Sequence, residues 1–149
     1  MTEYHLAQLN IATALASMDS GVMKDFAENL ERINGIGEAS PGFVWRLKDD
    51  SGDATSIQVY DDPNILVNLT VWQDADALKY FLFKTDHAQF LKRKKEWFKP
   101  VREANYVLWW VPVGHIPNVL EAKAKLEYLR EHGDSPQAFS FKKLFPAPT

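Results

Sequence analysis

The chain has 149 residues and a net charge of −3, with 46% hydrophobic and 25% charged residues, as expected of one soluble globular domain. It contains no cysteine, which excludes thiol catalysis, zinc–thiolate sites and disulfides. The small negative charge does not favour nucleic-acid binding, and no apolar run approaches the ~20 residues that cross a bilayer. The N-terminal sequence MTEYHLAQLN lacks the basic and apolar regions of a signal peptide, so we expect a single cytoplasmic domain over residues 1–149.

The first half of the chain changes between strand-like and helix-like patterns. Residues 4–12, YHLAQLNIA, alternate as a strand does. Residues 22–33 carry apolar side chains at helical spacing, and Gly35 and Gly37 are expected to end this helix. Residues 42–73 then predict two or three strands, separated by the turn sequences DDSGD and DDPN.

The second half continues with helices around one further strand. A helical stretch at residues 78–82 is followed by a second one, for which Asp86 is the expected cap. Residues 107–113 predict a strand that carries Trp109 and Trp110. A last helix should begin at the cap Asn118 and end at Gly133, and the closing AFSFKKLF alternates as a short final strand does.

This order of elements predicts the fold class. The order β-α-β-β-α-β, with an α-β extension, is typical of the ferredoxin-like α+β fold, an antiparallel sheet with helices on one face. The strands at 65–73 and 107–113 carry apolar residues on both faces. We therefore expect one face to pack on the helices of the chain and the other on a second copy, in a homodimer.

One stretch resembles a known family. Residues 68–90, NLTVWQDADALKYFLFKTDHAQF, resemble antibiotic-biosynthesis-type monooxygenases, in which a Trp-ended strand leads into a helix pair and a His follows a small or acidic residue. With WWVPVGH and AFSF, the whole chain looks like a related family known only as a domain of unknown function. The resemblance implies a dimeric α+β barrel, a homodimer with a small-molecule pocket between sheet and helices in each subunit.

The same resemblance suggests catalytic positions. Haem-degrading members of this barrel class use an Asn on the first strand, a Trp that ends the third strand and a His on the next helix. Asn10 and Trp72 fall where the first two would lie. The haem-binding His would lie about one turn beyond His87, roughly 5.4 Å along the helix, where this chain has Leu91. The comparison favours a site without a cofactor over a haem site.

His87 is the candidate for proton transfer, because imidazole titrates near neutrality and can carry a proton to or from a phenol or an enol. The alternative is a helix-start histidine that bonds a backbone group. Asn10, Asn68 and Trp72 occupy even positions and should share the face towards the helices. An asparagine inside a strand needs a partner for its amide, which would be either a substrate oxygen or a core hydrogen bond.

Further side chains are expected to bind the substrate. An apolar pocket should hold a planar ligand between the rings of Trp45, Trp72, Phe90 and Trp110. Arg46 could bind a carboxylate or pair with an acidic side chain at the strand edge. His115 could lie over Trp110 in the site, or instead serve the start of the following helix.

The sequence therefore predicts a small-molecule enzyme of monooxygenase-like type that acts on a planar, largely apolar substrate without a bound cofactor or metal. The alternative is a non-catalytic dimeric ligand-binding or stress-associated protein, and a haem-linked protein is a lesser alternative. Catalysis requires His87 within hydrogen-bond reach of the substrate, whereas binding requires only apolar walls and a fitting shape. No nucleic-acid or membrane partner is expected.

Overall fold

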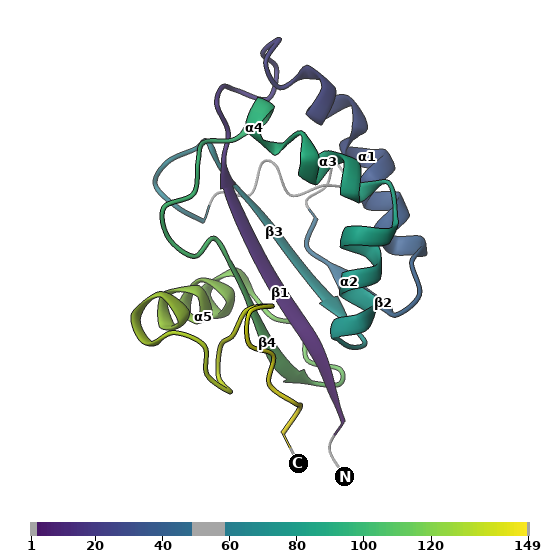
Figure 1. Ribbon diagram of the computed structural model, residues 1–149, viewed down its shortest axis with the longest axis vertical. Coiled ribbons are helices and arrows are strands. Elements are labelled where there is room, and N and C mark those ends of the chain that lie inside the picture. Colours follow the sequence, from purple (N-terminus) through teal and green to yellow (C-terminus); the bar gives the residue numbers. More distant parts are fainter. Residues whose placement is uncertain (1–2, 49–58, 149) are drawn as a thin grey trace.

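The protein is built on one four-stranded antiparallel sheet, which confirms the predicted α+β class. The computed structural model describes residues 3–48 and 59–148 (Figure 1). In spatial order the strands are β2 (Phe43–Arg46), β3 (Ile65–Trp72), β1 (Tyr4–Thr13) and β4 (Tyr106–Pro112). The first strand of the chain thus lies inside the sheet, with β3 on one side and β4 on the other.

Four helices lie on the sheet face formed by the even-numbered strand residues (Figure 1). They are α1 (Lys24–Ala39), α2 (Ala75–Lys84), α3 (His87–Lys92) and α4 (Lys94–Trp97). At one end of this face Leu6 and Trp72 pack against Leu78 of α2. At the other end Ala14 packs against Trp97 of α4.

The opposite sheet face is also covered within the single chain. Helix α5 (Val119–His132) lies on this second face, on the other side of the sheet from α1–α4 (Figure 1). Its Leu126 packs with Leu9 and Val71, and all three are almost fully buried. The expectation of helices on one face only is therefore wrong, because the last helix folds back onto the odd-numbered residues. Burial of this face does not require a second copy, and the homodimer stays a prediction.

The expected end of α1 is wrong as well. The helix continues through Gly35 and Gly37 and ends at Ala39. Gly37 is buried, and a Cβ atom there would lie 3.3 Å from the ring of Phe81 on α2. This glycine serves the close packing of two helices rather than the end of one.

The break between α2 and α3 falls where the sequence predicts it, but a different residue caps α3. The hydroxyl of Thr85 accepts from the backbone N–H of His87, at 3.2 Å. The carboxylate of Asp86 instead binds Arg32 on α1, at 3.0 Å. A further break at Arg93, between α3 and α4, was not predicted.

The C-terminal part follows the prediction up to its last element. Asn118 caps α5 by accepting from the backbone N–H of Glu121, and Gly133 ends the helix with a φ of 77°. The predicted final strand is not formed, since Phe139 makes only an isolated bridge to Leu108. A third strand between β2 and β3 would fall largely on residues 49–58, outside the described residues. None of the described helices has the length and apolar character needed to cross a membrane.

Candidate functional site

Two asparagines face each other in the middle of the sheet, on the side of α1–α4. Asn10 of β1 is the register partner of Asn68 of β3, and Tyr106 of β4 follows in the same row. Both asparagines are exposed although they belong to the two central strands. Neither amide makes a hydrogen bond to any described residue, so the alternative of a core hydrogen bond is not what the structure shows. We call Asn10 and Asn68 the asparagine pair.

Beside the asparagine pair, on the same face of the sheet, lies a buried network of side-chain hydrogen bonds. The indole N–H of Trp72 donates to the hydroxyl of Thr70, at 2.9 Å, and this hydroxyl donates to Oε1 of Gln8, at 2.8 Å. Trp72 also stacks on Phe81 of α2, with ring centroids 5.3 Å apart. Trp72 has no exposed surface, so it acts on any ligand in this conformation only through its neighbours.

His87 is half-buried at the start of α3, with its ring 4.8 Å from that of Phe81. Its Nδ1 lies 3.3 Å from the carbonyl oxygen of Leu82. Since a carbonyl only accepts, the proton of the neutral ring belongs on Nδ1, and Nε2 carries a lone pair. Burial lowers the pKa of His87 below its ordinary value of 6.5, and the bond to Leu82 opposes this in part. The ring is therefore neutral at pH 7 and can accept a proton at Nε2.

Packing links His87 to the sheet, but not directly to the asparagine pair. The ring of Phe81 contacts the rings of both His87 and Trp72. Trp72 is hydrogen-bonded to Thr70, which is hydrogen-bonded to Gln8. Within residues 3–48 and 59–148, no hydrogen bond joins His87 to either asparagine. The convergence of His87 and Asn10 on one substrate remains a prediction.

The predicted aromatic pocket is divided among separate clusters. Trp45 packs against the cluster under α5, on the opposite sheet face. Phe90 stacks on Trp97 near α4, with centroids 5.3 Å apart. Trp110 packs with Trp72 at the far end of the sheet, and its indole N–H donates to the carbonyl oxygen of Phe145. The structure does not bring the four rings together.

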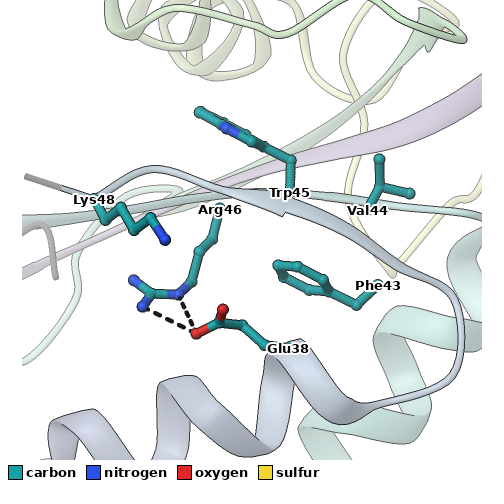
Figure 2. A pocket seen from close by; sticks show the side chains of 6 residues that line it. All are labelled: Glu38, Phe43, Val44, Trp45, Arg46 and Lys48. Carbon is teal, nitrogen blue, oxygen red and sulfur yellow. Dashed lines mark hydrogen bonds and ion pairs between the residues drawn. The ribbon is translucent and has the colours of Figure 1, made fainter. Parts of the chain in front are cut away.

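Arg46 borders an open hollow of about 370 Å³ at the edge of β2 (Figure 2). Its Nε and Nη2 atoms both bind Oε1 of Glu38, each at 3.1 Å, and Lys48 lies on the same side of the strand. Trp45 points to the other side (Figure 2). The pairing of Arg46 with an acidic side chain, one of the two predicted uses, is thus the one that the contacts show.

His115 lies in the connection between β4 and α5. Its Nε2 is 2.7 Å from Oε1 of Glu121, and the second carboxylate oxygen of Glu121 accepts from the indole N–H of the buried Trp109, at 3.0 Å. The contacts of His115 therefore favour its structural use at the start of the last helix over a place in a binding site.

Gln8, Thr70 and Tyr106 belong to this region but were missed in the sequence. The hydroxyl of Tyr106 accepts from the backbone N–H of Phe141, at 3.0 Å. All of these residues occupy even positions on β1, β3 and β4, which are neighbours in the sheet, and this shared parity is the signal that could have found them. Among the described residues, no group of three acidic or histidine side chains is placed to hold a metal ion.

Comparison with known families identifies the chain. The model of a family described as Domain of unknown function (DUF3291) matches residues 5–149. The chain belongs to this family. The expected membership of an uncharacterised family is thereby confirmed. No curated protein matches the DUF3291 chain.

Solved structures with a similar arrangement of elements have low sequence identity. SnoaB, a cofactor-independent oxygenase from Streptomyces nogalater, is 18% identical, with a TM-score of 0.48 over 76% of this chain and 98% of that one. A protein of unknown function from Nitrosomonas europaea, NE2512, is 13% identical, with a TM-score of 0.47 over 77% and 94%. PA3566 from Pseudomonas aeruginosa is 13% identical, with a TM-score of 0.47 over 78% and 99%.

Proposed function

We propose that this DUF3291 protein is a small-molecule enzyme of monooxygenase-like type that acts on a planar, largely apolar substrate. The substrate would lie on the helix-covered face of the sheet, with an oxygen atom on the asparagine pair. The observation that carries the proposal is this pair, Asn10 and Asn68, exposed in the middle of the sheet with amides that bond no described residue. Because both amides are exposed and unbonded within the described residues, their N–H groups can donate hydrogen bonds to a ligand oxygen.

Other groups on the helix-covered face would supply what this chemistry needs. Phe81 and the half-buried Tyr106 provide aromatic surface on the same face. His87, which is neutral because burial lowers its pKa, would accept the proton of an acidic C–H or O–H group at Nε2. The amide N–H groups stabilise the negative charge that develops on the substrate oxygen.

A planar aromatic ketone with an enolisable CH₂ group illustrates the reaction. His87 takes one proton from the CH₂ carbon, and the electron pair of that C–H bond moves into the enolate, whose oxygen lies on the amides. The carbanion carbon reacts with dioxygen, the oxidant of the reaction. One oxygen atom remains as a new carbonyl group and the other leaves as water with the two hydrogens of the CH₂ group. The substrate itself is oxidised and supplies all the electrons.

Anthrone is a suitable probe, since its oxidation to anthraquinone can be followed by absorbance and by oxygen uptake. The purified protein should accelerate both, and Asn68→Ala and His87→Gln should each lower the rate by about 10²-fold or more. Gln137→Ala, which removes an amide at an exposed position, is the matched control and should leave the rate unchanged. A rate no higher than that of spontaneous oxidation would refute the proposal for this substrate class.

The non-catalytic ligand-binding protein remains the second candidate, because no hydrogen bond links His87 to the asparagine pair in the described part of the chain. It predicts saturable quenching of tryptophan fluorescence by anthrone that Asn68→Ala weakens, without oxygen uptake. That combination would favour binding over catalysis.

A further inference from the structure

Gln8 is a buried amide whose orientation is fixed by its neighbours. Its side chain lies on the same face of β1 as Asn10, two residues away, and Gln8 and Thr70 are each 6% exposed. Thr70 is the register partner of Gln8 on β3, next to Asn68 on the same face. Gln8 is therefore a third amide beside the asparagine pair.

The hydrogen bonds around Thr70 decide which end of the Gln8 amide is bonded within the protein and which end is free. An indole N–H can only donate, so the hydroxyl oxygen of Thr70 accepts from Trp72. The single proton of that hydroxyl then goes to Oε1 of Gln8. With Oε1 committed to Thr70, the NH₂ group of Gln8 is turned away from it, and no described residue accepts from this group.

This geometry makes Gln8 a pair of N–H donors with no acceptor in the described protein. Among the described residues the only fully buried polar side-chain atom without a partner is Oη of Tyr60, so the NH₂ group of Gln8 keeps some exposure, through which a ligand can reach it. An N–H donor gains most from an acceptor that carries negative charge. The asparagine amides next to it can rotate, because nothing described holds them, whereas Gln8 is held as a donor. Among the three amides, Gln8 would therefore contribute most to the discrimination between a neutral and an anionic oxygen.

We propose that Gln8, Asn10 and Asn68 form one oxyanion-binding platform that selects the phenolate or enolate form of a planar aromatic ligand, with Thr70 and Trp72 as positioning residues. This inference rests on the proposed function for the location of the substrate. It adds the ionisation state that is bound and the residue that selects it. On binding, the O–H bond of the phenol breaks, its electron pair stays on the oxygen, and the proton passes to a base or to the buffer.

The test uses 1-naphthol, whose neutral and anionic forms differ in absorbance. Binding to the wild-type protein should lower the pKa of the naphthol by about one unit or more, which corresponds to roughly tenfold tighter binding of the anion. Gln8→Glu keeps an oxygen acceptor for Thr70 but replaces the donors with a negative charge. It should abolish or reverse the shift.

Two further variants separate positioning from stability. Thr70→Val removes the hydroxyl and should reduce the shift of the naphthol pKa, whereas Thr70→Ser restores the hydroxyl and should restore the shift. A merely structural role of Thr70 would change the melting temperature and leave the pKa of bound naphthol in place. Gln137→Glu adds the same charge at an exposed site and is the control, with an unchanged shift.

Each outcome decides the proposal. An unshifted naphthol pKa in the wild type, a full shift in Gln8→Glu or Thr70→Val, or no binding of naphthol would overturn the platform. Because anthrone oxidation is measured separately, oxidation without a naphthol shift would overturn the platform and leave the proposed function standing. A naphthol shift without oxidation would support the platform in a binding protein.

Discussion

His87 shows how a single side chain acquires chemical character from its surroundings. The ring is half-buried against Phe81, and its Nδ1 faces the carbonyl oxygen of Leu82. Burial penalises the charged form, so the pKa of His87 falls below 6.5 in the folded protein. The identity of the residue was evident from the sequence, whereas its tautomer and its lowered pKa depend on neighbours that only the packing of α2 and α3 supplies.

The lowered pKa predicts how stability depends on pH. Between the folded and the unfolded pKa of His87 the unfolded chain binds more protons, so the free energy of unfolding falls as the pH drops below 6.5. Urea denaturation from about pH 7.5 to pH 5 should show this loss, and His87→Gln should show less of it. His132→Gln, at an exposed position, is the control and should keep the wild-type slope. An identical slope in His87→Gln would contradict the burial of a neutral imidazole.

At the scale of elements, one carboxylate joins β4 to α5. Glu121 accepts from the buried Trp109 with one oxygen and contacts the exposed His115 with the other. Trp109 and His115 are therefore connected through one side chain, although the first is buried and the second is exposed.

Glu121→Met should leave the indole N–H of Trp109 without an acceptor, at a cost of roughly 1–3 kcal/mol, and lower the melting temperature by several degrees. Glu121→Gln retains an acceptor and should be milder. His115→Ala should also be mild, because it removes an exposed partner and leaves Trp109 bonded. A larger loss in His115→Ala than in Glu121→Met would contradict this arrangement.

The elements also show what periodicity can and cannot predict. The strands β1, β3 and β4, the cap at Asn118 and the stop at Gly133 were predictable because their signals are local, whereas the predicted final strand is not formed. The end of α1 was not, since Gly37 is needed for contact with Phe81, which lies far along the chain. The side of the sheet that α5 covers was not predictable either, because an apolar helix face fits either apolar sheet face.

The same limit applies to the candidate site. Alternation placed Asn10 and Asn68 on one face, and their register confirms that they are neighbours. Trp45 pairs with Val71 and lies on the odd-numbered face, opposite to Trp72, which alternation from Arg46 could have indicated. Phe90 belongs to the cluster beside α4, a placement that depends on how the helices pack, so of the four rings only Trp72 and Trp110 lie together.

At the scale of the whole molecule, the number of copies is open to a direct test. The resemblance to dimeric α+β barrels predicts a homodimer of about twice the 17.0 kDa chain mass, with more than ~1,000 Å² buried in total. Since α5 fills the sheet face first assigned to a partner, the contact surface must leave α5 in place. Light scattering at micromolar concentration measures the mass, and a value of 17.0 kDa would refute the homodimer.

The central position of β1 also determines when the fold can be completed during synthesis. Its Leu6 pairs with Trp72 on one side and with Trp110 on the other, so β1 has to wait for two segments that are made much later. Contacts between residues so far apart in the chain slow folding, and they leave apolar strand edges unpaired in the meantime. A nascent chain that stops before β4 keeps one edge of β1 open, and such chains should depend on chaperones until residue 112 has emerged.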